Sequence, residues 1–232
     1  VKAHVLPVTP HSGKYCWWSN RGDSINSTLT RSFDLSNLDT VTLQFWTWYE
    51  IEELWDYAYI EVSEDSGKTW KILAGQHTSS ENPSGNSYGH GLTGNSRVWV
   101  KETMDLTPFA GKTILLRFEY VTDDAVNLPG ICIDDISIPE LSYLDNIELK
   151  EDWQTEGFIR IDNLLSQTYI VQIIENSSPP MINQIILNDQ QEGEFIFDTS
   201  TSKNADITLA ISPTTRHTSE KASYKISLVE IE

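Results

Sequence analysis

Short strand-like runs, each closed by turn-forming residues, limit most strongly what this chain can fold into. Apolar or alternating runs are separated by clusters of Gly, Asn, Ser, Pro and Asp, and helical periodicity is almost absent. This pattern is typical of antiparallel β-sandwiches. The sequence therefore predicts an all-β chain, with a jelly-roll β-sandwich in residues 1–140 and a smaller β-sandwich in residues 141–232.

Within residues 13–139 the pattern predicts eight strands, which we place near Lys14–Ser19, Thr28–Asp34, Val41–Tyr49, Tyr57–Ser63, Thr69–Ala74, Arg97–Asp105, Thr113–Val121 and Gly130–Pro139. From about Leu141 the composition changes, because Trp153 is the last tryptophan and Ile and Leu supply most apolar positions. We expect five or six further strands there, in the runs TYIVQII, INQIILN, GEFIFD, ADITLAIS and SYKISLVEIE.

The stretch Leu43–Trp70 combines aromatic mass with negative charge. It holds four of the eight tryptophans and reads as two strands joined by an acidic corner. Most of these rings should fill the sandwich core, because aromatic side chains dominate such interiors. Trp55 lies inside the acidic corner and is the best candidate for an exposed, sugar-stacking ring. SEDSGKTW also fits a sialidase Asp-box, but it occurs once, so we interpret it as a hairpin turn built on Asp65 and Gly67.

The charge balance excludes several partners. The 232-residue chain has a net charge of −18, and residues 1–140 (10 basic, 19 acidic) and 141–232 (6 basic, 15 acidic) each contribute −9. Nucleic acid and anionic membranes are disfavoured, because phosphate binding depends on Lys and Arg. No apolar run is long enough to span a membrane. The chain begins with Val and shows no signal peptide, so we expect a processed piece of a longer, secreted protein.

The two cysteines, Cys16 and Cys132, are too few for a zinc site, which needs four close ligands. Both lie in apolar strand-like segments. A disulfide between them and two buried free thiols remain alternative interpretations.

Strand alternation has a geometric consequence for the loops. If the eight strands run up and down, the connections SNRGDS, EIEELWD, Gly75–Ser96 and TDDAVNLPG share one end of the sandwich. These are the long, acidic or Gly- and Asn-rich connections, whereas the short turns fall at the opposite end. This asymmetry predicts a functional face.

Several long motifs resemble one known family. SNRGD, LQFWTWYEIEELWDYAYIEVSEDSGKTW, ENPSGN, LRFEYVTDDAVNLPGICIDDISIPE and EGFIRIDN resemble, in order, the non-catalytic region downstream of the catalytic domain in immune inhibitor A-type secreted bacterial metallopeptidases. The FW…IDDI pairing is also similar to MAM-type jelly rolls. The resemblance covers most of residues 13–165. It implies an extracellular, MAM-like accessory β-sandwich that binds structural Ca²⁺ and whose partner is an upstream catalytic domain of the same polypeptide.

The acidic loops are candidate calcium ligands. Calcium takes six to eight oxygen ligands, and clustered carboxylates repel one another unless a cation offsets them. Among the acidic segments, IDDI is the most specific indication of a metal site, because two adjacent Asp in a strand must place one carboxylate inward or at a bulge. The alternative is a solvated acidic rim. The predicted metal ligands are Asp23, Glu50, Glu52, Asp56, Asp123, Asp124, Asp134 and Asp135.

Catalytic signatures do not accompany these motifs. None of the five His begins the HExxH of a zinc peptidase, so we expect no zinc in this chain and no enzyme activity of its own. Paired carboxylates for glycoside cleavage would need a defined separation, which nothing here fixes. The expected function is accessory: the region braces the catalytic domain or holds substrate. The rival is a stand-alone adhesion or carbohydrate-binding module that contacts a protein or glycan surface.

Overall fold

The computed structural model describes residues 2–149, 152–196, 206–216, 218 and 220–229. It divides into two compact units, one of Val8–Asp162 and one of Val1–Pro7 with Asn163–Glu232. The predicted all-β class is confirmed, because the regular elements in these residues are strands and two short 3₁₀ turns, Thr107–Phe109 and Pro139–Leu141. No helix among the described residues has the length and apolar character needed to cross a membrane.

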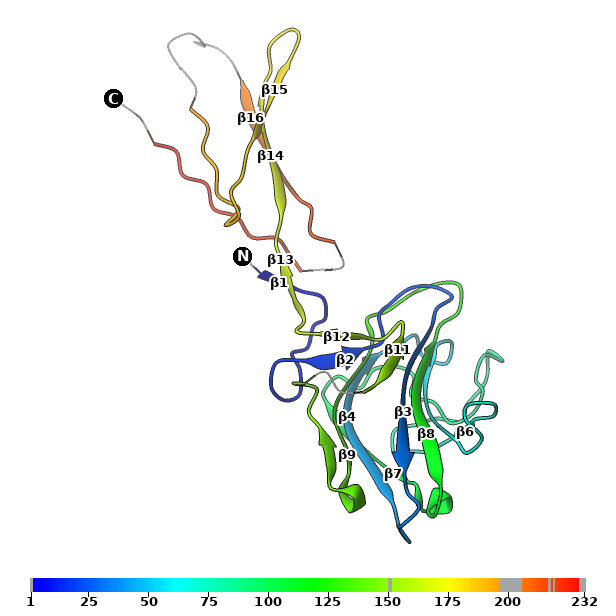
Figure 1. Cartoon of the computed structure of the whole chain (residues 1–232). Coiled ribbons are helices and arrows are strands. Elements are labelled where there is room, and N and C mark those ends of the chain that lie inside the picture. Colours follow the sequence, from blue (N-terminus) through cyan, green and yellow to red (C-terminus); the bar gives the residue numbers. More distant parts are fainter. Residues whose placement is uncertain (1, 150–151, 197–205, 217, 219, 230–232) are drawn as a thin grey trace. The chain divides into compact units, whose positions relative to one another are not determined.

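The first unit contains two antiparallel sheets (Figure 1). One sheet has the strand order β12-β2-β9-β4-β7, and β10 also pairs with β9. Its strands are β2 (Cys16–Trp18), β4 (Thr42–Glu50), β7 (Val100–Asp105), β9 (Gly130–Ile138), β10 (Tyr143–Asp145) and β12 (Ile159–Ile161). The other has the order β11-β3-β8-β5-β6, and its strands are β3 (Asn26–Asp34), β5 (Tyr57–Ser63), β6 (Lys71–Ile72), β8 (Thr113–Val121) and β11 (Gln154–Glu156).

Side-chain alternation builds the core between these sheets. On β8, Ile114, Leu116, Phe118 and Tyr120 are buried in the core cluster, while the residues between them face the other side of the sheet. All eight strands predicted in residues 13–139 overlap an observed strand, and those at 57–63 and 113–121 agree end to end. Period-two patterning fixes such strands locally, because a slip of one residue would move every apolar side chain out of the core.

The IDDI motif forms a β-bulge. Phe45 of β4 lies between pairs Gln44–Ser137 and Trp46–Asp134, so β9 has one residue more than its partner there. Asp135 takes a left-handed backbone, with φ of 47°. The extra residue resets the alternation, so that Ile133 before the bulge and Ile136 after it both enter the core.

The boundary between the units lies later than the sequence pattern placed it. Strands β10, β11 and β12 pair with β9, β3 and β2, so residues 141–162 complete the first sandwich. Trp153 is 7% exposed within the core cluster, and its indole N–H donates to Asp145 Oδ2 at 2.9 Å. The change in composition near residue 140 therefore does not mark the end of the first hydrophobic core.

In the second unit, β1 (Lys2–His4) pairs with β13 (Leu164–Ser166), and β14 (Tyr169–Glu175) lies between β15 (Met181–Ile185) and β16 (Ile207–Pro213). The predicted runs TYIVQII, INQIILN and ADITLAIS each overlap one of these last three strands. GEFIFD and SYKISLVEIE carry no strand where the structure describes them, and residues 197–198 and 230–232 of these runs lie outside the described residues. The smaller sandwich remains a prediction.

The hairpin between β5 and β6 follows the predicted turn chemistry. Asp65 Oδ1 accepts the backbone N–H groups of Lys68 and Thr69 at 3.1 and 2.9 Å, and Asp65 Oδ2 accepts the Thr69 hydroxyl. These bonds, led by the Thr69 hydroxyl, lower the pKa of Asp65 to about 2. Gly67 supplies the left-handed backbone of the turn at φ of 86°.

Both cysteines are buried free thiols in the structure. Burial, with Cys16 alongside, raises the pKa of the Cys132 thiol. Because the thiolate is the reactive form, we expect iodoacetamide to leave both side chains unmodified in the native protein and to alkylate both after unfolding in urea, as read by mass spectrometry. Absence of alkylation in the unfolded, unreduced protein would instead indicate a disulfide.

Candidate metal-binding loop end

The four connections predicted to share one end of the sandwich do meet. Ser24 N–H donates to the Asp123 carbonyl at 2.5 Å, which joins the first and last of these loops. Ile51 N–H donates to the Gly94 carbonyl at 2.8 Å, which joins the acidic corner to the long loop before β7. The Thr93 side-chain oxygen also accepts the backbone N–H of Leu54 at 2.8 Å. Loops far apart in sequence are thus tied into one surface.

Three carboxylates converge at this loop end. Glu52, Asp56 and Asp123 each place an oxygen within 4.8 Å of the others, and we call them the acidic cluster. Asp56 is fully buried, and its Oδ1 accepts the Asp123 backbone N–H at 2.8 Å. Its Oδ2 is also buried and has no hydrogen-bond partner among the described residues. A buried, unpaired carboxylate oxygen is costly, and a proton or a bound cation on this atom would relieve that cost.

The electrostatics of the acidic cluster agree with its geometry. The pKa of Asp56 is raised to about 6, chiefly by burial and in addition by the charges of Asp123, Glu52 and Asp23, while the Asp123 N–H bond opposes the rise. The pKa of Glu52 is also raised, first by desolvation and then by Asp123. Like charges at this distance destabilise one another unless a cation or a proton offsets them. The cluster can therefore hold a proton or a metal ion.

Backbone strain accompanies the acidic cluster. Leu54, between Glu52 and Asp56, has φ of 64°, and Val126, just after Asp123, has φ of 60°. A left-handed backbone is unfavourable for such residues, above all for a β-branched one. Strain of this kind persists only where surrounding contacts impose it. Both acidic loops are therefore held by tertiary contacts in conformations that local preference disfavours.

Of the other predicted ligands near this end, Asp23 lies close enough for its charge to act on Asp56, and its Oδ1 accepts the Asn127 side-chain N–H at 2.8 Å. Glu50 ends β4 opposite Gly130 and is not part of the cluster. Asp124 is exposed and also lies outside it. Asn127 was not a candidate in the sequence analysis, since an amide in a polar loop carries no distinguishing signal.

Asp134 and Asp135 have different partners. Asp134 Oδ2 accepts the Ser12 backbone N–H at 3.1 Å, and Asp135 binds His11 Nδ1 at 2.6 Å and the Ser12 hydroxyl at 2.8 Å. Burial raises the pKa of Asp134 to about 7. The expectation that one of the two carboxylates lies inward or at a bulge is thus confirmed, but the structure does not bring Asp134 or Asp135 into the acidic cluster. No sequence signal marked His11 and Ser12 as their partners.

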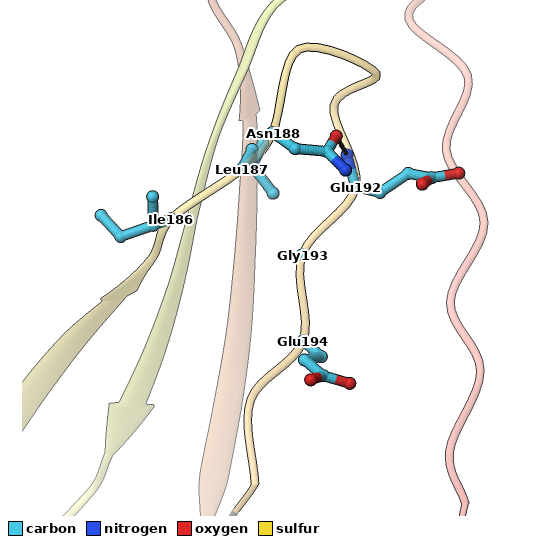
Figure 2. A pocket seen from close by; sticks show the side chains of 6 residues that line it. All are labelled: Ile186, Leu187, Asn188, Glu192, Gly193 and Glu194. Atoms are coloured by element: carbon cyan, nitrogen blue, oxygen red, sulfur yellow. Dashed lines mark hydrogen bonds between the residues drawn. The ribbon is translucent and has the colours of Figure 1, made fainter.

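A hollow of about 550 Å³ lies in the other unit along the loop after β15 (Figure 2). Its lining includes Glu192 and Glu194, whose carboxylates point apart rather than toward a common centre. Asn188 Oδ1 accepts the Glu192 backbone N–H at 2.9 Å, so this amide serves the local turn. The hollow offers no convergent ligand set.

Comparison with known proteins connects this loop end to one family. The sequence model of the family "Immune inhibitor A-like, MAM domain" matches residues 2–163. Pre-pro-metalloprotease PrtV of Vibrio cholerae is 28% identical over 159 residues, which is 67% of this chain and 17% of the relative. Immune inhibitor A of Bacillus thuringiensis is 31% identical over 160 residues, which is 67% of this chain and 22% of the relative.

Bacillopeptidase F of Bacillus subtilis is 27% identical over 100 residues, which is 43% of this chain and 6% of the relative. The matched regions are thus small parts of these curated relatives. The family model nevertheless spans more than half of this chain and the whole of the loop end described above. The chain belongs to the immune inhibitor A-like MAM domain family.

Proposed function

We propose that this chain is a non-catalytic, accessory region of a secreted metallopeptidase, and that its acidic cluster holds a structural calcium ion. The observation that carries the metal site is the buried Asp56 Oδ2, which has no partner among the described residues although two further carboxylates lie beside it. An isolated solvated rim would not require such a buried atom.

Oxygen donors suit calcium rather than zinc. Calcium accepts carboxylates, carbonyls and water in flexible arrangements, whereas structural zinc sites use Cys and His, which the acidic cluster lacks. Glu52 and Asp56 would hold the ion from the loop after β4, and Asp123 from the loop after β8. The ion would offset their mutual repulsion and fix two strained loops against each other.

The accessory role is supported by what this chain matches. Two of its relatives, PrtV and bacillopeptidase F, are named as proteases, and these two and immune inhibitor A are all far longer than the region they share with it. None of its five His starts an HExxH motif. The proposed partner is therefore a catalytic domain of the same polypeptide. This region would either brace that domain or hold substrate for it. Hydrolysis of casein by the purified chain, abolished by a zinc chelator, would contradict the non-catalytic assignment.

Thermal unfolding tests the metal site. We expect saturating calcium, added after chelation, to raise the melting temperature by about 5–10 °C, because a hundredfold excess over Kd stabilises the folded state by about 2.7 kcal/mol. Magnesium should do much less, since it loses its water reluctantly. Circular dichroism across a calcium titration gives the measurement.

Two adjacent residues provide a matched comparison. Asp123→Asn should abolish the calcium response, while Asp124→Asn makes the same charge change at an exposed position outside the acidic cluster and should retain it. If calcium does not change the melting temperature of the unmodified chain, or if both variants lose the calcium response equally, these carboxylates form a solvated rim.

A further inference from the structure

An aromatic pocket adjoins the acidic cluster. It measures about 310 Å³, within the usual range of ligand sites at its lower end, and lies between the sheet and the long loop before β7. Its aromatic and polar lining includes Trp55, Tyr57, Tyr59, Tyr88, Asn86 and Asp123. Asp123 therefore belongs to both the aromatic pocket and the acidic cluster.

Three tyrosines form a fixed wall of this pocket. Tyr57 and Tyr59 stack with ring centroids 5.9 Å apart, and Tyr59 and Tyr88 stack at 5.5 Å. The hydroxyl groups of the inner two are engaged, since Tyr57 donates to the Glu81 carbonyl at 3.1 Å and Tyr59 accepts the Tyr88 backbone N–H at 2.9 Å. These bonds anchor the long loop over the sheet, so the wall is built before any ligand arrives.

Two rings of the pocket remain in contact with water. Trp55 is 49% exposed and Tyr88 is 67% exposed, whereas Tyr57 and Tyr59 are 1% exposed. Exposed aromatic surface gathered around a concavity is a mark of binding sites. The core has no need of either ring, because the sandwich interior is filled by other residues.

Polar groups stand beside these rings. Asn86 donates its side-chain N–H to the Trp55 carbonyl at 3.3 Å, which holds the indole-bearing loop in place, while its Oδ1 accepts no hydrogen bond from the described residues. Asp123 Oδ1 accepts the Ala125 N–H at 3.0 Å. An entirely apolar ligand would desolvate these amide and carboxylate oxygens without replacing their bonds to water, which is unfavourable.

We infer that the aromatic pocket binds one pyranose unit of a neutral glycan. A pyranose has an apolar C–H face, which would pack on Trp55, and a rim of hydroxyl groups, which would bond Asn86 and Asp123. The alternative for an aromatic cage beside a carboxylate is an organic cation. A calcium ion on Asp123 would repel such a cation, so the preference for a neutral ligand rests on the proposed function.

The test titrates the calcium-saturated chain with soluble oligosaccharides that end in glucose, galactose, mannose or N-acetylglucosamine, with binding measured by calorimetry. At least one sugar should bind saturably. Trp55→Ala should weaken that binding at least tenfold and Tyr88→Ala should weaken it too. Tyr224→Ala, which removes a 64% exposed aromatic ring elsewhere, should leave it unchanged.

Because Trp55 and Tyr88 are exposed, both variants should keep the unmodified chain's melting temperature, which separates lost binding from lost folding. Absence of binding by every sugar, equal binding by Trp55→Ala, or saturable binding of tetramethylammonium in place of sugars would overturn the inference. A calcium-dependent rise in melting temperature without sugar binding refutes only the aromatic pocket's role. Sugar binding that persists in chelator supports the pocket even where the calcium response is absent.

Discussion

Asp56→Asn is expected to abolish stabilisation by calcium and, without calcium, to make the protein more stable near neutral pH. Asn keeps an oxygen that can accept the Asp123 N–H, and it replaces the unpaired Oδ2 by an N–H donor beside two carboxylates. It also removes one negative charge from the acidic cluster. The variant therefore relieves the repulsion that calcium would otherwise offset.

The pH dependence of the calcium-free protein shows at which pH Asp56→Asn should be the more stable of the two proteins. The folded pKa of Asp56 is raised to about 6, above the value of about 3.9 for an unfolded chain. The folded state therefore holds this proton more tightly, and the stability so gained is present below about pH 4 and is lost as the pH rises through about 6. Above that pH we expect the free energy of unfolding of Asp56→Asn to exceed that of the unmodified chain by up to about 3 kcal/mol, because the two pKa values differ by about 2 and each pKa unit is worth about 1.4 kcal/mol.

Urea unfolding at several pH values, each with chelator and with calcium, measures both effects. The unmodified chain should become more stable than Asp56→Asn once calcium is saturating, so the order of the two proteins reverses. Asp124→Asn, exposed and outside the acidic cluster, should follow the unmodified chain in both conditions. An Asp56→Asn protein that is less stable than the unmodified chain in chelator would contradict this account of the buried carboxylate.

Arg117→Met is expected to cause the largest loss of stability among exchanges outside the hydrophobic core. Arg117 bonds Glu61 Oε2 through Nε at 3.0 Å and through Nη2 at 2.6 Å, and its Nη2 also bonds Glu119 Oε2 at 2.9 Å. Its guanidinium lies 3.9 Å from the centroid of the Trp70 ring. Both carboxylates are buried, so removal of their shared cation should cost about 3–5 kcal/mol near neutral pH.

The loss should shrink in acid. Burial already raises the pKa of Glu61 to about 7 against the opposing bond from Arg117. Without Arg117 this pKa rises above about 7, so the stability that the bound proton gives the variant is fully present below about pH 4 and is lost progressively as the pH rises from there past about 7. Urea unfolding at both ends of this range measures the difference.

A double variant at this site and a control variant elsewhere separate the contribution of charge from that of packing. Glu61→Gln added to Arg117→Met should recover part of the loss, because only one buried carboxylate then lacks its cation. Arg97→Met exchanges an exposed arginine and should change stability little. A loss in Arg117→Met that is equal at acid and alkaline pH would indicate that contact with Trp70, rather than charge, is what stabilises the site.

Local patterning along the chain was enough to predict the eight strands between residues 13 and 139, an IDDI carboxylate placed inward or at a bulge, and the end at which the acidic loops meet. These features depend on local order along the chain: alternation sets which face a side chain takes, and an up-and-down path sets where each loop emerges. Trp55 could be singled out for the same reason, since an aromatic residue inside an acidic loop has no place in the core.

Which carboxylates come together depends instead on how distant segments pair in the folded chain. Asp56 and Asp123 are brought within reach by the pairing of β5 with β8, whereas Asp134, equally acidic in sequence, is buried against Ser12 from a distant segment. The inclusion of residues 141–162 in the first sandwich was decided in the same way, by pairing with β2, β3 and β9. Local pattern sets the direction of a side chain, whereas its neighbours across the fold depend on strand register and loop path, which a single sequence does not reveal.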